Sequence, residues 1–539
     1  MAVAEPRLVP IIYVRGFAMT QNEIDETSFD PFNGFNIGST TLRARPNKTD
    51  KPRKQIFESP MVRLASDYGY ADAFEDGYDI LDPEWEVGAD GTPTGNRLSN
   101  ACVIVFRYYD VAATAFGGQS TPSIQDSARD LSALVAQVRE LVCANPANNM
   151  QPADFRCYLV AHSMGGLICR AFLQNPALDP MGTHDCVSRL FTYATPHNGI
   201  EIASTNVPSW LTPFKVANFN RQTMADYLDL KTAFGATGRV DLIPESRFPS
   251  RNVFCMVGTN RLDYEVAAGL SRTFVGHGSD GLVRIENATL CALNNDGTIG
   301  TQCAKAFAYR SHSGPYGIVN SEEAYQNLVR FLFGDVRIDI WMDISEIRLP
   351  EKLSTPAMAG KVDALYQIEL NASPRGKFWY LTRRKAEEDS VACVRHRTWQ
   401  EEPRQYLSSV FLSRKARVNP KRPSLAYAMS VGVRVPDYEV DGILWTKEHY
   451  EGGYLFQNAL VLEITPPPAA GGSWRAKYAW QGNGIREADV NLPLQQSPNG
   501  EIVATIDFDS TGQGDAQAPQ PTSPGIRGTM RFVVSSWNV

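Results

Sequence analysis

The periodicity of the apolar residues changes near residue 335, and this change constrains the fold of the 539-residue chain more than any other feature. Before it, short apolar runs such as residues 8–14 and 102–109 alternate with helical stripes. In the helix predicted over residues 123–142, apolar side chains recur every three or four positions. Strands that are apolar on both faces, alternating with amphipathic helices, indicate a mostly parallel sheet covered by helices. We therefore predict an α/β domain over residues 1–335.

Beyond residue 335 the period is two. In residues 336–344, Val, Ile and Met alternate with Arg, Asp and Trp. Residues 364–370 and 378–381 are further runs that we predict as strands, and turns rich in Pro and Gly, such as residues 465–472, separate the runs. About nine short strands with no helical stripe among them predict an antiparallel β-sandwich over residues 336–539.

Composition places the chain among ordinary globular proteins. Apolar residues make up 43 % of it and charged residues 21 %, which is enough apolar material for a core. The formal charge of −7 argues against a dedicated nucleic-acid binder, so no nucleic-acid partner is predicted. The chain has neither an apolar stretch of about 18 residues nor the pattern of a signal peptide. We expect a cytoplasmic protein, with export by a route that needs no signal as the alternative.

The cysteines and short motifs give no sign of a bound group. The nine cysteines are scattered, without a Cys-x-x-Cys pair or metal-ligand spacing. Cys291 and Cys303 flank a turn rich in Gly, Asn and Asp, and their pairing in an oxidising compartment is left open. No phosphate-binding loop, no G-x-G-x-x-G motif after a strand and no H-E-x-x-H motif occurs. We therefore predict neither a cofactor nor a metal.

Residues 159–166, Leu-Val-Ala-His-Ser-Met-Gly-Gly, carry the clearest functional signal. An apolar strand ends, Ser163 follows, and a helix begins. The small residues Ala161 and Gly165 leave room for a strained backbone at the serine. The N–H groups at the start of a helix favour negative charge. The pattern matches G-x-S-x-G with Ala161 in place of the first glycine, and it predicts Ser163 as a nucleophile.

A serine nucleophile needs a histidine as base and a carboxylate that orients the histidine. When the serine lies at a strand-to-helix corner, the acid and then the histidine follow it along the chain. His312 comes directly after the last predicted strand of the first half, so we predict it as the base, with His277 as the alternative. We expect His197 to have a structural or lid-hinge role and His184 to be solvated.

For the acid we predict Asp280, in a Gly-rich loop between two predicted strands, with Asp263 as its competitor. Acyl transfer also requires N–H donors directed at the developing oxyanion. One is the N–H of Met164, the residue after the nucleophile, and the other is expected from a loop after an early strand. Residues 11–17, Ile-Ile-Tyr-Val-Arg-Gly-Phe, supply such a loop, so we predict the N–H of Phe17 as the second donor.

Residues 200–249 are too long for an ordinary connection and are predicted to form a lid over the site. Their apolar side chains, among them Trp210, Phe214 and Phe219, favour a substrate with an apolar chain. Aromatic residues in the second half are candidates for a platform that contacts the substrate or a membrane surface, although packing in the core or in turns is the commoner role. These residues are Trp379, Tyr380, Trp474, Trp480 and Trp537.

The first half resembles the lipase and esterase branch of the α/β-hydrolases, in particular the GPI inositol-deacylase-like and lecithin–cholesterol acyltransferase-like lipases. The resemblance covers about residues 8–334. It rests on Val-Arg-Gly-Phe after a strand (14–17), Ala-His-Ser-Met-Gly-Gly (161–166), Ala-Thr-Pro-His-Asn-Gly (194–199) and Gly-Ser-Asp-Gly-Leu-Val (278–283).

The resemblance implies Ser163 as nucleophile, Asp280 as acid, His312 as base, and Phe17 with Met164 as oxyanion donors. It also implies a lid at 200–249, and fatty-acid or phospholipid esters as substrates. We predict a serine hydrolase that cleaves small-molecule or lipid esters through an acyl-enzyme. The alternatives are an acyltransferase on the same fold, and an exported effector or binding protein in which the sandwich carries the recognition.

Overall fold

The structure is a computed structural model, and it separates into two compact units. The described residues are 8–16, 39–42, 54–57, 59–75, 78–79, 97–106, 108, 123–200, 216–260, 280, 282–312, 317–355, 360–385, 393–417, 419, 421–440, 448–467, 472–481, 488–497, 501–511 and 524–538. The α/β unit comprises Pro6–Lys305 and Tyr309–Leu328, and the β-rich unit comprises Ala306–Ala308 and Val329–Val539. The domain boundary at 335/336 stays a prediction.

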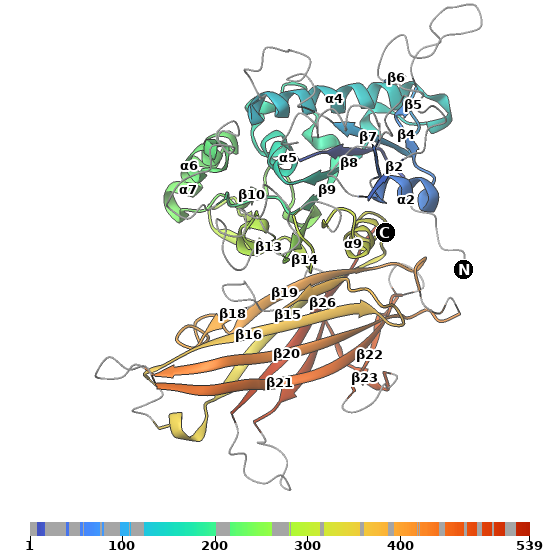
Figure 1. Cartoon of the computed structure of the whole chain (residues 1–539). Coiled ribbons are helices and arrows are strands. Elements are labelled where there is room, and N and C mark those ends of the chain that lie inside the picture. Colours follow the sequence, from blue (N-terminus) through green and yellow to red (C-terminus); the bar gives the residue numbers. More distant parts are fainter. Residues whose placement is uncertain are drawn as a thin grey trace, which may run out of the picture. The chain divides into compact units, whose positions relative to one another are not determined.

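A seven-stranded sheet forms the centre of the α/β unit (Figure 1), in the order β14-β11-β9-β8-β1-β7-β4. The pairs β4–β7, β7–β1, β1–β8, β8–β9 and β9–β11 are all parallel, as the continuous apolar runs predict. The bounds are β1 Ile11–Val14, β4 Ala71–Asp72, β7 Cys102–Phe106, β8 Cys157–His162, β9 Val187–Tyr193, β11 Val253–Gly258 and β14 Ala304–Ala308.

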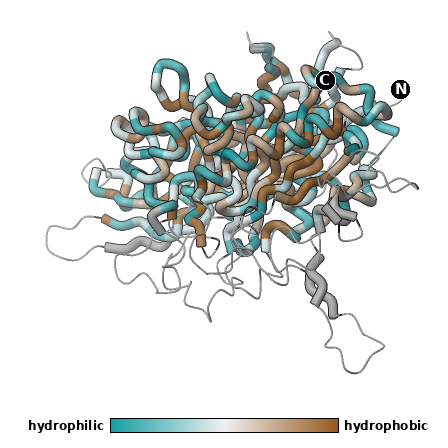
Figure 2. Tube along the Cα trace, turned by 90° about the horizontal axis from the view of Figure 1, so that it is seen from above, coloured by the Kyte–Doolittle hydropathy of each residue, from teal (hydrophilic) through white to brown (hydrophobic). Residues whose placement is uncertain are grey.

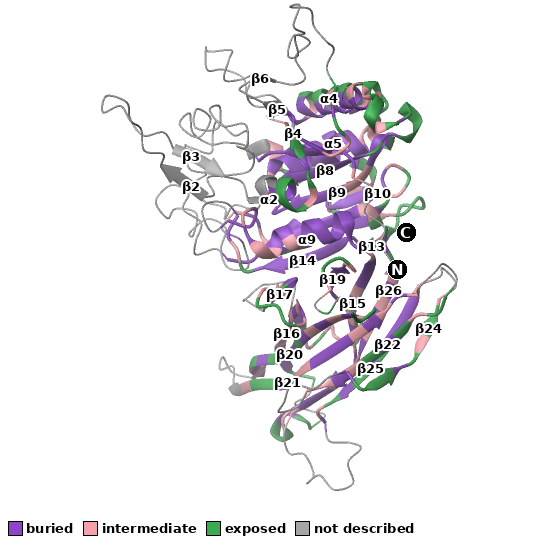
Figure 3. Ribbon diagram, turned by 90° about the vertical axis from the view of Figure 1, so that its right-hand side faces the viewer, coloured by how far each residue is buried: buried purple, intermediate pink, exposed green. Residues whose placement is uncertain are grey.

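Helices cover this sheet. The apolar stripe of α4 packs with α5 and with alternate strand residues such as Ile12 and Val14 in one core, while Ile11 and Tyr13 on the opposite face are equally buried. Figure 2 shows apolar segments in the interior and hydrophilic ones outside, and Figure 3 shows β8 and β9 buried. The helices are α2 Ser59–Tyr68, α4 Ile124–Ala144, α5 Met164–Gln174, α6 Arg221–Tyr227, α7 Lys231–Thr237 and α9 Glu322–Phe333.

Local sequence signals set the helix starts. Ser123 caps α4, and its side chain accepts a hydrogen bond from the N–H of Asp126. The Ser321 hydroxyl accepts from the N–H of Ala324 at the start of α9. Among the described helices, none is long and apolar enough to cross a membrane.

Two antiparallel sheets make up the β-rich unit, as the period of two predicts. Their orders are β19-β15-β26-β25-β24 and β17-β16-β20-β21-β22-β23, with β18 paired to β16, and their apolar faces meet in one core. The bounds are β15 Val336–Arg348, β16 Val362–Pro374, β17 Thr382–Arg384, β18 Cys393–Arg395, β19 Arg404–Leu412, β20 Leu425–Val440, β21 Glu448–Thr465, β22 Arg475–Trp480, β23 Val490–Leu492, β24 Leu494–Gln496, β25 Ile502–Asp509 and β26 Gly525–Ser536.

The structure corrects two expectations about strands and adds a sheet that was not predicted. Residues 378–381 form a bend, and the strand begins only at Thr382, because Leu381 and Thr382 are buried whereas Phe378 is exposed. The long strands span 13 to 18 residues, so the prediction of short strands was wrong for β15, β16, β20 and β21. A small sheet of β10 (Leu242–Pro244), β12 (Cys291–Leu293) and β13 (Ile299–Gln302) was not predicted, and β10 lies within the expected lid.

The cysteines and the candidate aromatic platform are also placed. All nine cysteines are among the described residues, and the structure records no disulfide between them, Cys291 and Cys303 included. Trp537 is buried, and Trp379, Trp474 and Trp480 pack partly buried against the sandwich core. Tyr380 remains 38 % exposed.

A polar network joins α4 to the loop before β9. The Asp179 carboxylate accepts hydrogen bonds from the Ser132 hydroxyl at 2.6 Å, the Thr183 N–H at 2.9 Å and His184 Nδ1 at 2.7 Å. Burial by itself raises the pKa of Asp179, but these hydrogen bonds outweigh it and hold the pKa below its usual range. The expectation of a solvated His184 was wrong, because Asp179 holds its ring.

We expect Asp179→Asn to lower the free energy of unfolding by about 1–3 kcal/mol at pH 7, because hydrogen bonds to a charged acceptor are lost. A depressed pKa in the folded state stabilises the fold above the unfolded-state pKa of about 3.9 and ceases to do so as the pH falls through the folded value. The difference in the free energy of unfolding between wild type and Asp179→Asn should therefore become smaller below about pH 4.

Urea unfolding at pH 7, 5 and 3.5 measures this gap. The control is Asp154→Asn, because the Asp154 side chain is exposed and its loss should change stability little at any of these pH values. A gap between wild type and Asp179→Asn that stays constant from pH 7 to 3.5 contradicts the assignment.

Candidate active site

Ser163 lies at the corner between β8 and α5. Its backbone has φ 52° and ψ −126°, a region that L-residues rarely occupy and that costs about 1–3 kcal/mol. Two hydrogen bonds hold this conformation: the N–H of Ser163 donates to the Tyr193 carbonyl at 2.9 Å, and the N–H of Gly166 donates to the Ser163 carbonyl at 3.1 Å. The strained turn expected from the sequence is therefore present, and it leaves the Ser163 side chain half-buried.

Three glycines allow the chain to pack around this corner. A Cβ at Gly165 would lie 2.3 Å from the carbonyl oxygen of Val14, and one at Gly166 would lie 2.1 Å from Thr195 Oγ1. A Cβ at Gly16 would lie 3.2 Å from Ser163 Cβ. The residues that follow β1 therefore adjoin the serine, where a second oxyanion donor was expected. Phe17 itself lies outside the described residues.

The structure brings His312 and Asp280 to Ser163, although they are far apart in the sequence. His312 Nε2 lies 2.9 Å from Ser163 Oγ, and His312 Nδ1 lies 2.9 Å from Asp280 Oδ2. The carboxylate accepts from Nδ1–H, so Nε2 is left as the acceptor for the serine hydroxyl. His312 follows β14, Ser163 follows β8 and Asp280 lies beyond β11, so all three lie at the carboxyl edge of the sheet.

Asp280 is held by more than its contact with His312. Its Oδ1 accepts from the N–H groups of Leu282 at 3.0 Å and Val283 at 2.8 Å, which leaves Oδ2 for the imidazole. The N–H of His312 also donates to the Asp280 carbonyl at 3.0 Å. Asp280 and His312 are both almost completely buried, so their hydrogen bond is shielded from water.

His162 is a contributor that the sequence analysis did not single out. Its Nε2–H donates to the carbonyl oxygen of His312 at 3.0 Å, and the centroids of the two rings are 5.0 Å apart. On its other side, a Cβ at Gly16 would lie 2.7 Å from His162 Nδ1. The residue before the serine thus lies between the loop after β1 and the backbone that carries His312. In the sequence, only its position next to Ser163 pointed to a role for His162 in the site.

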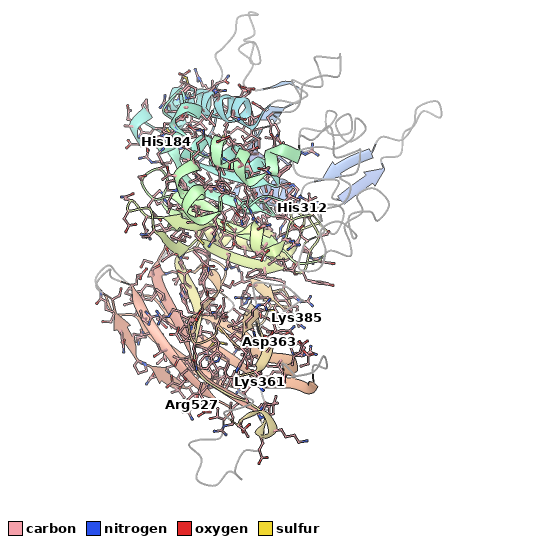
Figure 4. All side chains as sticks on the ribbon, turned by 90° about the vertical axis from the view of Figure 1, so that its left-hand side faces the viewer. His184, His312, Lys361, Asp363, Lys385 and Arg527 are labelled. Carbon is pink, nitrogen blue, oxygen red and sulfur yellow. The ribbon has the colours of Figure 1, made fainter. Side chains whose placement is uncertain are left out.

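His197 and His184 have partners of their own. His197 is fully buried, its Nε2 lies 3.1 Å from Thr192 Oγ1, and burial, followed by the charge of Arg170, lowers its pKa well below the usual value. His184 lies with Asp179, away from His312 (Figure 4). The two competitors named from the sequence, His277 and Asp263, lie outside the described residues.

Arg170 on α5 is a fully buried cation that the sequence analysis also missed. Its guanidinium donates to the carbonyl oxygens of His197 at 3.0 Å, Val240 at 2.8 Å and Leu242 at 2.7 Å. Burial lowers its pKa to about 10. These bonds fasten the segment after β9 and the start of β10 to α5, the helix that begins at Met164.

The described part of the predicted lid contains α6 and α7, and residues 201–215 lie outside the described residues. A cavity of about 360 Å³ lies beside these helices and is lined by Asn198, Ile200, Phe219, Phe234 and three further residues. Ser163 does not line it. Among the described residues, no group of three or more His, Cys, Asp or Glu side chains is arranged to hold a metal ion.

Residues 92–243 match the model of a protein family described as a PGAP1-like alpha/beta domain. The matched segment contains β7, α4, β8, the Ser163 corner, α5 and β9. Together with the parallel sheet and its helices, this match shows the α/β fold class that the sequence predicts, and it makes the matched segment similar to a PGAP1-like alpha/beta domain.

The chain is similar to two solved structures of low sequence identity. The mature form of lipase BlEst2 from Bacillus licheniformis is 16 % identical, with 62 % of this chain and 96 % of that chain covered and a TM-score of 0.30. Phospholipase PlaB from Legionella pneumophila is 13 % identical, with 82 % and 91 % covered and a TM-score of 0.30. No curated protein sequence matches the chain significantly.

We expect Gly166→Ala to lower the free energy of unfolding by about 1–3 kcal/mol, because the added methyl group overlaps the Thr195 side chain. Thr195→Ala in the same chain removes Oγ1 and Cγ2 and should restore part of the loss. Thermal unfolding measures both. The control is Gly235→Ala in α7, which has open space around it and should gain about 0.5–1 kcal/mol. Equal stability of Gly166→Ala and wild type contradicts the packing described here.

Proposed function

We propose that the chain is a serine hydrolase that cleaves carboxylic esters, with Ser163 as nucleophile, His312 as general base and Asp280 as the acid that orients the histidine. One observation carries the proposal: an unbroken pair of 2.9 Å hydrogen bonds links Asp280, His312 and Ser163 at a positive-φ corner.

In this proposal, Ser163 Oγ attacks the ester carbonyl while His312 Nε2 takes its proton. Asp280 keeps its own charge and stabilises the imidazolium. The N–H of Met164, the first residue of α5, has no partner within the helix and is a donor for the oxyanion, with the Phe17 N–H as the predicted second donor. Each donor is worth about 2.7–4 kcal/mol of barrier. His312 then protonates the leaving alcohol, and water releases the acyl group by the reverse sequence.

Lipid or other long acyl esters are the proposed substrate class. The match to the PGAP1-like alpha/beta domain model supports a hydrolase of the lipase and esterase branch. The segment 200–249 supplies apolar side chains, of which Phe219 and Phe234 flank the cavity beside α6 and α7. A hydrocarbon chain gains free energy by burial against such side chains, at about 25 cal/mol per Å².

We expect Ser163→Ala and His312→Ala each to lower kcat on p-nitrophenyl esters by about 10⁴-fold or more. Asp280→Asn should lower kcat by about 10⁴-fold, because His312 then loses the partner that sets its tautomer. An ester series from acetate to palmitate measures these losses, and its optimum separates an esterase from a lipase. A fluorophosphonate probe should label wild type and not Ser163→Ala.

The control is Ser66→Ala, which alters an exposed serine on α2 and should retain wild-type rates and labelling. Equal turnover by wild type, Ser163→Ala and His312→Ala would remove the basis for the proposed hydrolase.

We propose His162 as a positioning residue for His312. His162→Phe removes the hydrogen bond to the His312 carbonyl and should lower kcat about tenfold with KM unchanged, whereas His162→Gln keeps an N–H donor and should recover most of the rate. The melting temperature separates a positioning role from general destabilisation. An equal loss of kcat in both variants contradicts this role.

A further inference from the structure

Four strands of the seven-stranded sheet in the β-rich unit begin or end at one place. β16 ends at Pro374, β20 begins at Leu425, β21 ends at Thr465 and β22 begins at Arg475. The register joins them: Pro374 lies opposite Tyr427, Ala426 opposite Glu463, and Thr465 opposite Arg475. Neighbouring strands lie about 4.8 Å apart, so these four strand ends form a rim about 15 Å wide.

Positive charge gathers on this rim. Residues 374–378, 421–427, 463–467 and 472–478 contain six Lys or Arg and a single acid, Glu463. We name the six residues the basic rim: Arg375, Lys377, Lys421, Arg422, Arg475 and Lys477. All except Arg375 are exposed, and Arg375 pairs with Glu463 at 3.5 Å. The charge is local, because the whole chain has a formal charge of −7.

The turn that follows β16 adds an apolar tip. The Lys377 N–H donates to the Pro374 carbonyl at 3.1 Å, and the Arg375 N–H donates to the Ala426 carbonyl at 3.1 Å, so the turn is fastened to β20. Phe378 at this turn is fully exposed, and Tyr380 is partly exposed. Trp379 between them packs toward the core, with the Arg330 guanidinium 5.0 Å from its ring. The turn therefore presents Phe378 to the solvent from an ordered backbone.

We propose that the basic rim, with Phe378 at its tip, docks onto an anionic lipid surface. Lys and Arg attract anionic headgroups, and a Phe side chain beside them gains free energy by entering the acyl region. Moving an exposed phenyl ring from water into the hydrocarbon of a membrane is favourable in free energy, because its apolar surface leaves water. The proposal lies outside the α/β unit and does not depend on the proposed hydrolase reaction.

The experiment uses the full chain carrying Ser163→Ala, so that hydrolysis does not alter the lipid. Sedimentation with phosphatidylcholine vesicles containing 30 % phosphatidylserine should give binding that weakens between 50 and 300 mM salt, and vesicles of phosphatidylcholine alone should bind far less. Phe378→Ser should reduce the partition coefficient about tenfold. Lys377→Glu should reduce it at least about fivefold, because a cation is replaced by an anion.

Two matched controls should stay within about twofold of the parent. Met181→Ser alters an exposed apolar residue in the segment before β9, and Lys361→Glu alters an exposed lysine (labelled in Figure 4) just before β16, at the opposite end of that strand from Lys377. Equal loss in the controls and the rim variants overturns the proposal, as does absent vesicle binding.

Binding of a labelled single-stranded RNA to the same protein tests whether the basic rim recognises a nucleic acid instead of a lipid surface. Salt-sensitive RNA binding without vesicle binding overturns the lipid assignment, because the basic rim then recognises phosphate without needing Phe378 in a bilayer. Loss of esterase activity in the separate Ser163 test leaves the vesicle result unaffected, so failure of one proposal is distinguishable from failure of the other.

Discussion

The positive φ of 52° at Ser163 is the constraint on which the rest of the candidate site depends. It turns the chain from β8 into α5 within one residue and places the side chain beyond the carboxyl edge of the sheet. The strain is held because the Ser163 N–H bonds to Tyr193 on the neighbouring strand and the next helical turn bonds back to the serine carbonyl. The surrounding glycines matter because a Cβ at Gly165 would meet the Val14 backbone and one at Gly166 would meet the Thr195 side chain.

The geometry opposite the serine depends on two loops from distant parts of the chain. Asp280 and His312 are joined twice, once through their side chains and once through the His312 N–H and the Asp280 carbonyl. His162 adds a bond to the His312 carbonyl from the strand that leads into the corner. The base is therefore fixed through backbone as well as side-chain contacts, which limits the freedom of its ring and preserves the alignment with Ser163.

In the β-rich unit, the surface features are set by strand ends and turns. Its long antiparallel strands bury one face in a shared core and leave the strand ends and turns to set the surface. The basic rim arises there because the register brings four strand ends together, although its lysines and arginines come from three segments spread over about 100 residues of sequence. Cationic residues that are distant from one another in the sequence thus become neighbours in the structure.

The sequence by itself determined the two periodicities, the strand–serine–helix corner and the residues Asp280 and His312 that the structure brings to Ser163. Each can be read along the chain: apolar side chains at alternate positions or at every third or fourth position, the backbone demands of a tight turn, and the order of the motifs. Only the tertiary structure decided the hydrogen bond from His162 to His312, the carbonyl oxygens around Arg170, the hydrogen bond between His184 and Asp179, and the assembly of the basic rim. These depend on strand order and register, which bring together residues with no shared pattern in the sequence.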